Sequence, residues 1–257
     1  MRDKLIFFLR VSGRSVWLAV ELGFALLRFS VLMVAHGGIP NRAARARWLQ
    51  QICRRVLFVF HLEWRVTGPV PSSGLLVCNH LSYLDILVLG ATTPCVFVSK
   101  REVRSWPVFG WFASLAGTLF VRRDERSAVS RATREMRQVL DTGALVVLFP
   151  EGTTSDGRDV LPFKSSLLEA ATQQPHGLSA GFIEYDLNEG SVTNEVCYWR
   201  DMTLVPHLLN LLGKRGLEAR LCFTELREAS PNRKHLARQL HAEVVRLKEV
   251  LSVSTCA

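Results

Sequence analysis

The sequence of 257 residues lacks the patterns that mark several common classes of protein. It contains no Cys-x-x-Cys pair and no cluster of cysteines and histidines, which argues against a zinc site. The six cysteines are scattered and several lie within apolar runs, as expected of reduced core thiols rather than of a disulfide framework. No internal repeat or low-complexity segment is present. One large domain with an appendage, or at most two small domains, fits this length.

The sequence also lacks a recognisable nucleic-acid-binding module, although it is strongly basic. Its net charge of +9 favours an anionic partner such as nucleic acid, a lipid head-group surface or a phosphorylated substrate. The basic residues gather in the first 55 positions and again at 233–248, without the interleaved aromatics of a nucleic-acid interface. We interpret the C-terminal group as a solvated helix face and expect no nucleic-acid partner.

The N-terminal basic region brackets a long apolar run, Ser15–Ala35, which is about the length needed to cross a bilayer core. The run contains Glu21 and Arg28, which share one helix face because they lie two turns apart. A cleaved signal peptide is not favoured, because no clear cleavage site follows. The helix spans the membrane, lies in the head-group plane, or packs on the protein's own core. We favour membrane association and predict residues 1–58 as an N-terminal membrane-associated helical region.

From about residue 60, short β-rich runs alternate with helical patterns. This alternation predicts, over residues 59–257, an α/β domain with a mixed, largely buried sheet flanked by helices. The first run, 61–68, alternates like an edge strand. The other predicted strands are 74–79, 95–100, 117–123, 144–150, 179–185, 195–199 and 217–226, and the predicted helices are 82–91, 124–143, 163–173, 203–213 and 231–252.

Polar side chains follow three of these strands, at the positions where functional residues collect in such sheets. Asn79-His80 ends one strand, Arg122-Arg123 ends a second, and Glu151 to Ser155 end a third. Each group follows a run too apolar to lie on the surface. Each is therefore presented at the rim of the sheet.

His80 and Asp85 lie five positions apart within an otherwise apolar segment, 75–89. Burying either side chain without a partner costs several kcal/mol, so both require an explanation. In one interpretation, Asp85 completes a capping box with Ser82 and His80 is satisfied at the strand end. In the other, the Asp85 carboxylate holds one ring N–H of His80 and leaves the second nitrogen basic for a substrate hydroxyl. The residues alone support both.

The turn FPEGTTSDG offers small and hydroxylated residues whose backbone N–H groups can bind an anion. Glu151 is available to bind a donor group, although Gly152, Thr153 and Thr154 are also ordinary turn formers. The Arg122-Arg123 pair adds a cation at another strand end, and a guanidinium suits phosphate.

In this order and at these separations, NHLSYLD, GTLFVRR and FPEGTTS resemble the glycerolipid acyltransferase family, which includes the 1-acyl-glycerol-3-phosphate acyltransferases. The family's His-x-x-x-x-Asp pattern matches His80 and Asp85. Its glycine-to-arginine block matches Gly117–Arg123, and its Phe-Pro-Glu-Gly block matches Phe149–Gly152. The resemblance covers about residues 60–225 and implies a glycerol-3-phosphate acyltransferase-like fold.

Two positions depart from the family pattern. Thr154 stands where arginine is common, and Ala180 stands where proline is usual. The stretch EVCYWRDMTLVPHLLNLL is similar to the subset that includes bacterial lyso-ornithine-lipid acyltransferases. A zwitterionic head group has less use for a second phosphate-binding arginine, so this subset fits the change at Thr154.

The resemblance implies an O-acyltransferase of phospholipid and membrane lipid biosynthesis. Through its N-terminal hydrophobic helix, we expect the protein to associate with the cytoplasmic face of the inner membrane. It would move a fatty acyl group from acyl-CoA or acyl carrier protein to the free hydroxyl of a lysophosphatidate-type lysolipid or lyso-ornithine lipid, with no cofactor and no metal. His80 would take the hydroxyl proton and Asp85 would stabilise the imidazolium. The substrate-binding residues would be Arg122, Arg123, Glu151, Gly152, Thr153 and Thr154.

Two other functions stay open on the sequence. A lipid hydrolase or thioesterase would use the same pair with water, although we expect no serine nucleophile of the elbow type. A catalytically silent lipid-binding protein would keep the fold. The departures at Thr154 and Ala180 leave room for it, whereas His80, Asp85 and Glu151 are all present.

Overall fold

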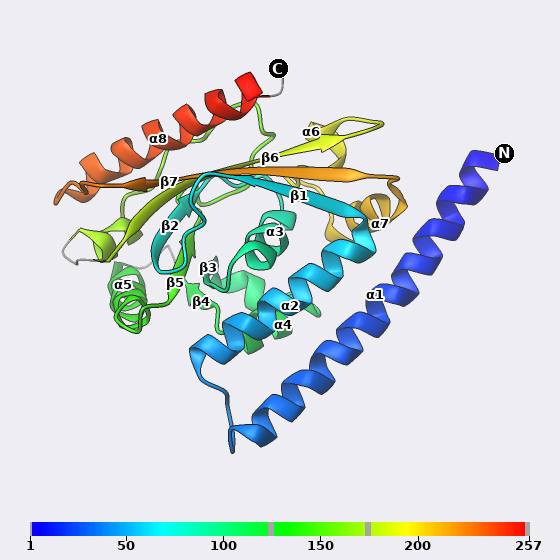
Figure 1. Cartoon of the computed structure of the whole chain (residues 1–257), viewed down its shortest axis with the longest axis horizontal. Helices are drawn as coiled ribbons and strands as arrows, with labels where there is room; N and C mark the ends of the chain where they lie inside the picture. The colour runs from blue at the N-terminus through cyan, green and yellow to red at the C-terminus, as the bar shows by residue number, and fades with distance from the viewer. Residues whose placement is uncertain (1, 123–125, 173–175, 255–257) are drawn as a thin grey trace.

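The computed structural model describes residues 2–122, 126–172 and 176–254. Within them, a seven-stranded sheet runs in the order β1-β7-β6-β2-β5-β3-β4 (Figure 1). β6 and β7 pair antiparallel, and the other neighbours are parallel. The strands are β1 Leu62–Thr67, β2 Gly74–Cys78, β3 Val96–Lys100, β4 Leu119–Val121, β5 Leu145–Leu148, β6 Leu178–Leu187 and β7 Leu217–Leu226.

Helices cover both faces of this sheet, and Figure 1 shows α8 on the side opposite to α1 and α2. The first face carries α1 Arg2–Ala35, α2 Arg42–Phe60, α3 Leu84–Thr92, α4 Phe109–Ala116, α6 Val192–Glu195 and α7 Leu204–Gly213. The second face carries α5 Arg126–Leu140, α8 Arg233–Ser254 and the 3₁₀ turn η2 Leu167–Ala171. A further 3₁₀ turn, η1 Arg101–Ser105, follows β3.

β2 and β5 lie in the middle of the sheet and are buried along their whole length. Along β2, Leu76 and Cys78 join the core under the first face, whereas Leu75 and Val77 join the core under the second. A short continuous apolar run is what a parallel strand covered on both sides requires. The prediction of a mixed, largely buried sheet is therefore confirmed, and so is the edge position of the first strand.

Two predicted elements are wrong. Residues 195–199 form no strand, because α6 ends there and an irregular segment follows. The N–H of Cys197 donates back into α6 at 2.9 Å, and the N–H of Tyr198 donates to the carbonyl oxygen of Leu81 at 2.8 Å. These backbone N–H groups therefore have other partners and are not available for hydrogen bonds to a neighbouring strand. Within 163–172, the predicted helix is reduced to the η2 turn.

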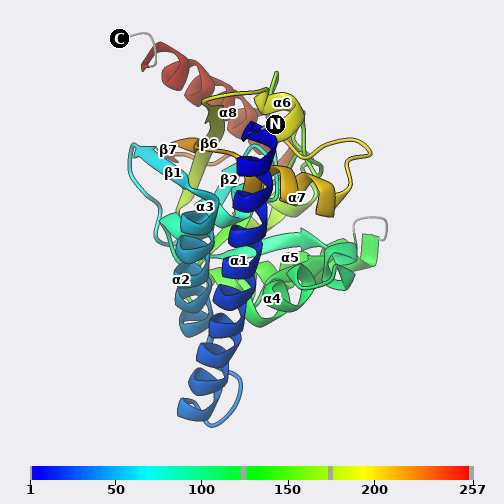
Figure 2. The ribbon, with the colours of Figure 1, turned by 90° about the vertical axis from the view of Figure 1, so that its right-hand side faces the viewer.

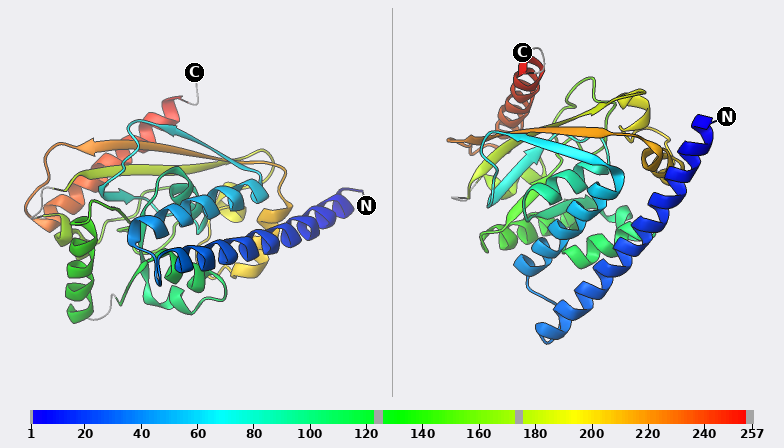
Figure 3. Two further views of the ribbon diagram at one scale, coloured as in Figure 1. Left: turned by 60° about the horizontal axis from the view of Figure 1, so that its bottom comes forward. Right: turned by 45° about the vertical axis from the view of Figure 1, so that its right-hand side comes forward.

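α1 begins at Arg2, so the helix extends well before the apolar run that starts at Ser15. It is long and apolar enough to cross a membrane, and only 17% of its most apolar stretch is buried. α1 and α2 run antiparallel, side by side (Figures 2 and 3). Arg14 donates to the carbonyl oxygens of Leu212 and Lys214 at 2.9 and 2.6 Å, and so satisfies the free carbonyls at the end of α7. The predicted domain boundary at residue 58 falls in the last turn of α2.

Candidate active site

The carboxyl ends of β2, β5, β3 and β4 meet at one edge of the sheet, because these strands are parallel neighbours. His80 comes shortly after β2, Glu151 shortly after β5, and the exposed Arg122 directly after β4. The structure therefore brings members of all three predicted polar groups to a common edge. Arg123 lies outside the described residues.

Asn79 ties the end of β2 to the neighbouring strand β6. Its side-chain Nδ2 donates to the carbonyl oxygen of Ile183 at 2.9 Å, and its Oδ1 accepts from the N–H of Ile183 at 2.8 Å. The side chain is buried, so this clamp satisfies its amide without water. It holds the backbone just before His80 against the middle of the sheet.

The imidazole of His80 and the carboxylate of Asp85 are in direct contact, with 2.7 Å between Nδ1 and Oδ2. The same oxygen accepts from the backbone N–H groups of Leu81 at 2.6 Å and Ser82 at 3.0 Å. The hydroxyl of Tyr185 donates to the second oxygen, Oδ1, at 2.6 Å. Asp85 is fully buried, and its carboxylate accepts hydrogen bonds from these four donors in place of water. It organises the turn and holds a ring nitrogen of His80 at the same time.

The predicted capping box forms only in its acidic half. α3 begins at Leu84, and Tyr83 rather than Ser82 occupies the N-cap position, with no side-chain cap bond. The Asp85 carboxylate does accept from the N–H of Ser82, whereas the buried Ser82 hydroxyl has no hydrogen-bond partner within the described chain. The two interpretations of Asp85 from the sequence therefore coexist in one geometry.

Phe149 sets the plane of the His80 ring. The two rings stack with centroids 4.0 Å apart and an interplanar angle of 12°. The His80 side chain keeps 18% of its accessible surface, so the ring is held but still reachable. Nδ1 contacts Asp85 and one ring face contacts Phe149, so Nε2 is the ring nitrogen that these two contacts leave available.

Glu151 stands beside His80 with very little solvation. Its Oε1 accepts from the backbone N–H of His80 at 3.3 Å, and its buried Oε2 has no hydrogen-bond partner in the described part of the chain. Burial raises the pKa of Glu151 to about 8, and the nearby Asp85 carboxylate acts in the same direction. At neutral pH this side chain therefore mostly carries a proton, and it can offer that proton to a polar group of a substrate.

The turn after β5 is held against the turn after β2. Gly152 adopts φ 76°, a conformation that favours glycine. The N–H of Ser155 donates to the carbonyl oxygen of His80 at 3.0 Å. Thr153 is exposed and Thr154 is half-buried, so both lie where a ligand at this edge can reach them.

Residues 177–181 spell Gly-Leu-Ser-Ala-Gly, the letters of a hydrolase nucleophile elbow. Ser179, however, lies inside β6, is 4% exposed, and pairs with residues of β2 and β7. An elbow nucleophile stands at a sharp turn between a strand and a helix, so Ser179 is not one. Burial also raises the pKa of the Cys78 thiol well above its usual value, which leaves no ready thiolate beside His80.

Residues 63–193, about half of the chain, match the family model described as Acyltransferase. The chain belongs to the acyltransferase family. The matched region contains His80, Asp85 and Glu151, so the site at the sheet edge lies within the family's domain.

This acyltransferase is 36% identical to a lyso-ornithine lipid O-acyltransferase of Rhodobacter capsulatus, over 91% of the chain and 84% of that protein. It is 32% identical to a 1-acyl-sn-glycerol-3-phosphate acyltransferase of Neisseria meningitidis, over 76% of each. The crystal structure of the 1-acyl-sn-glycerophosphate acyltransferase PlsC from Thermotoga maritima has the same fold, with a TM-score of 0.63, 19% identity, and 96% and 97% of the two chains covered. The family predicted from three short motifs is confirmed.

Tyr185 and Phe149 are contacts of the pair that sequence reasoning missed as site residues. Phe149 was visible as the first letter of the Phe-Pro-Glu-Gly block, but nothing in that block predicts ring stacking on His80. Tyr185 lies 100 positions from Asp85, so only the pairing of β6 with β2 brings them together.

Replacing Glu151 by glutamine should change how the stability of the acyltransferase depends on pH. An unfolded carboxyl releases its proton near pH 4.5, whereas folded Glu151 keeps its proton up to about 8. As the pH rises through this window, the free energy of unfolding of the wild type therefore falls by up to about 1.4 kcal/mol per pH unit. Glu151→Gln lacks the carboxyl and does not show this fall. Urea unfolding at pH 5.5 and pH 8 should show the variant gaining stability relative to the wild type at the higher pH. The exposed Glu225→Gln on β7 is the matched control, and an equal response in both variants would contradict the prediction.

Proposed function

We propose that this acyltransferase moves a fatty acyl group from acyl-CoA or acyl carrier protein to the free hydroxyl of a lysolipid at the membrane surface. The observation that supports it most is the contact of 2.7 Å between His80 Nδ1 and Asp85 Oδ2, which leaves Nε2 at the sheet edge. A base so placed suits a hydroxyl that must lose its proton as it attacks a thioester.

The proposed reaction needs no acyl-enzyme. His80 Nε2 takes the proton of the acceptor hydroxyl while the hydroxyl oxygen attacks the thioester carbonyl carbon. The buried Asp85 carboxylate stabilises the imidazolium that forms. When the tetrahedral intermediate collapses, the carbon–sulfur bond breaks, and the imidazolium returns its proton to the leaving thiolate. The products are the acylated lipid and the free thiol of the donor.

The remaining site residues are proposed to hold the two substrates. Arg122 and Arg123 would bind phosphate of the acceptor or of the donor, because a guanidinium binds phosphate bidentately. Glu151, with its unpartnered Oε2, would orient the acceptor hydroxyl. The backbone of Gly152 and the hydroxyls of Thr153 and Thr154 would line the same edge.

The acceptor proposed first is lyso-ornithine lipid. The relatives with that name in Rhodobacter capsulatus and Rhizobium meliloti are 36% and 35% identical to this chain. Thr154 also stands where family members that bind a phosphate commonly have arginine, and an acceptor without a phosphate does not need that side chain. Lysophosphatidate is the alternative acceptor.

Replacing His80 by alanine should abolish acyl transfer while the protein still folds. Loss of a general base costs about two to four orders of magnitude in turnover. Turnover should be measured with a labelled acyl donor, and folding should be checked by circular dichroism. His235→Ala on the exposed side of α8 is the control and should keep full activity. Retained transfer in the His80 variant would refute the proposed base.

The acceptor can be identified from the products of the purified enzyme. It should be given equal amounts of lyso-ornithine lipid and lysophosphatidate, with acyl-CoA or acyl carrier protein, and the lipids analysed by mass spectrometry. We expect diacylated ornithine lipid as the main product. Free fatty acid as the main product would favour the hydrolase instead, and no turnover with either donor would favour a silent lipid-binding protein.

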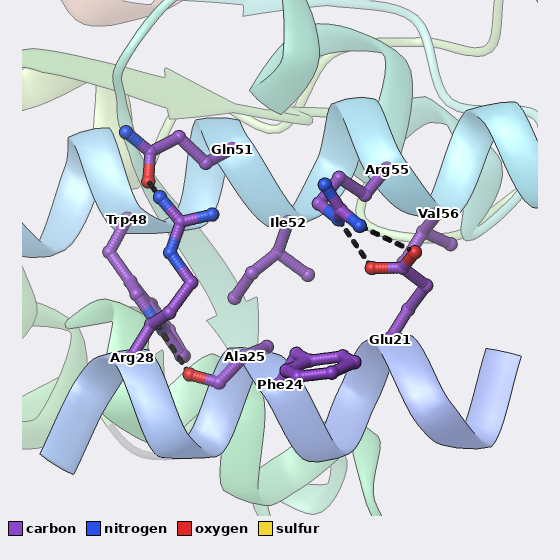
Figure 4. Close-up of a pocket in the computed structure, with 9 residues that line it drawn as sticks. All are labelled: Glu21, Phe24, Ala25, Arg28, Trp48, Gln51, Ile52, Arg55 and Val56. Carbon is purple, nitrogen blue, oxygen red and sulfur yellow. Dashed lines mark hydrogen bonds and ion pairs between the residues drawn. The ribbon is translucent and has the colours of Figure 1, made fainter.

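We also propose that α1 holds the enzyme on the cytoplasmic face of the inner membrane by lying along the surface of the bilayer. One side of α1 presents exposed apolar side chains, namely Leu5, Phe8, Leu9, Val16, Val20, Leu27, Val31 and Val34. The other side is tied to α2 (Figure 4): Arg55 binds Glu21 at 2.8 Å, Arg28 bonds to Gln51, and the indole of Trp48 donates to Ala25. A helix tied to the body at both halves of its length suits an interfacial position better than a span.

The two ends of α1 should therefore react with a membrane-impermeant maleimide from the same side. Lys4→Cys and His36→Cys place a thiol near each end, both at exposed positions, and Cys256→Ser removes a native thiol from the background. The enzyme is bound to the outside of preformed vesicles, and labelling in detergent defines complete reaction. Both thiols should label to a similar extent. Protection of one end alone would indicate that the helix crosses the bilayer.

A further inference from the structure

The hydroxyl of Tyr185 reaches the one oxygen of Asp85 that His80 does not contact. It lies 2.6 Å from Oδ1, whereas Nδ1 of His80 and two backbone N–H groups converge on Oδ2. Tyr185 is 6% exposed and Asp85 is fully buried, so water does not compete for this contact. Both oxygens of the carboxylate thus accept hydrogen bonds, and the donor to Oδ1 is the Tyr185 hydroxyl.

The direction of this hydrogen bond is fixed. Burial raises the pKa of Tyr185 well above its usual value, and the adjacent Asp85 carboxylate raises it further. The phenol therefore keeps its proton, and a phenol facing a carboxylate oxygen can only donate. The O–H dipole of Tyr185 therefore points its positive end at Oδ1 of Asp85.

The backbone of β6 places this hydroxyl. β6 runs parallel to β2 with Cys78 opposite Gly181, so β6 continues past the point where β2 ends. The amide of Asn79 then clamps Ile183 through both of its backbone groups. Tyr185 is two positions further along, on the same face as Ile183, and lies under the first turn of α3. Both residues belong to the core that also contains the start of that helix.

We propose that Tyr185 is a positioning residue of the acyltransferase centre. Its hydroxyl keeps the Asp85 carboxylate in the rotamer that directs Oδ2 to His80, and it moderates the negative field of that carboxylate at the imidazole. The inference rests on the proposed roles of His80 and Asp85. It adds to the pair a third side chain, from a strand outside the three motifs that carry the family resemblance.

Removing the hydroxyl has two consequences. The buried carboxylate loses the donor of one oxygen, so its rotamer is held less firmly. Its charge is also less compensated and therefore favours the protonated ring of His80 more strongly. At low pH, kcat/KM falls because the base becomes protonated, and this fall is the acid limb of the pH profile. The acid limb should consequently move to higher pH.

Other titratable groups face this cluster from neighbouring elements. Cys78 of β2 and Cys197 after α6 stay uncharged, because burial raises the pKa of both thiols far above neutrality. Glu151, after β5, titrates at about 8 and therefore acts on the alkaline side of the profile. The acid limb is thus the part of the profile that reports on Tyr185, Asp85 and His80.

The test is the pH profile of Tyr185→Phe, which removes one oxygen and keeps the ring. We expect kcat to fall about tenfold, the KM values of both substrates to stay within about twofold, and the acid limb to shift to higher pH. Tyr198→Phe is the matched control, because Tyr198 contacts the same turn through its backbone N–H. It should leave kcat and the limb unchanged. A Tyr185→Phe limb that coincides with that of the wild type would overturn the proposal, even if activity fell.

A second substitution tests the same idea without loss of packing, should Tyr185→Phe fold poorly. 3-Fluorotyrosine at position 185 is a stronger hydrogen-bond donor of nearly the same shape, so the acid limb should shift to lower pH. Absence of a shift, or a shift to higher pH, would also overturn the proposal. His80→Ala separates this result from the proposed function: if that variant keeps its activity, the assignment of the base has failed, whatever Tyr185 does.

Discussion

The burial of one carboxylate, that of Asp85, is the constraint on which the active edge of this sheet depends. A carboxylate without access to water is tolerated only when hydrogen-bond donors replace its hydration. Here the donors come from the His80 ring, from two consecutive backbone N–H groups and from the hydroxyl of Tyr185. Satisfying this charge fixes the turn between β2 and α3 and the orientation of the His80 ring together. The local fold and the chemistry of the site therefore have the same physical origin.

A second buried carboxyl, that of Glu151, lies at the same edge but has fewer hydrogen-bond donors than Asp85. It has little solvent and an oxygen without a partner among the described residues, so it holds a proton up to about pH 8. Two acidic side chains near one histidine thus differ in their surroundings, because four donors converge on Asp85 whereas Oε2 of Glu151 has no partner among the described residues. Asp85 can stabilise a cation on His80, whereas Glu151 is able to donate a hydrogen bond to a polar group that enters the site.

Much of this arrangement could be predicted from the sequence, and the limits have physical causes. Continuous apolar runs identified the central strands, because a strand covered on both faces needs such a run. The five-residue spacing of His80 and Asp85 left two interpretations open, a capping box and a contact between the two side chains, and the family resemblance favoured the contact. The segment 195–199 looked like a strand, but its backbone N–H groups bond to α6 and to the turn at Leu81. Tyr185 was not predictable, because its role depends on how far β6 extends past the end of β2.

The position of α1 relative to the site bears on how a lipid acceptor is used. Ala25 and Phe29 of α1 belong to the same continuous core as Leu81, Phe149 and Tyr185. The proposed membrane-facing helix and the turn that carries His80 are therefore packed in one layer. Drawing a lysolipid fully into water would cost roughly 0.8 kcal/mol for each methylene exposed. If that layer rests on the bilayer, the acyl chain can stay in lipid while only the head group rises to Nε2. The contacts that hold α1 against the body then matter for catalysis as well as for attachment, because they set the height of the base above the membrane.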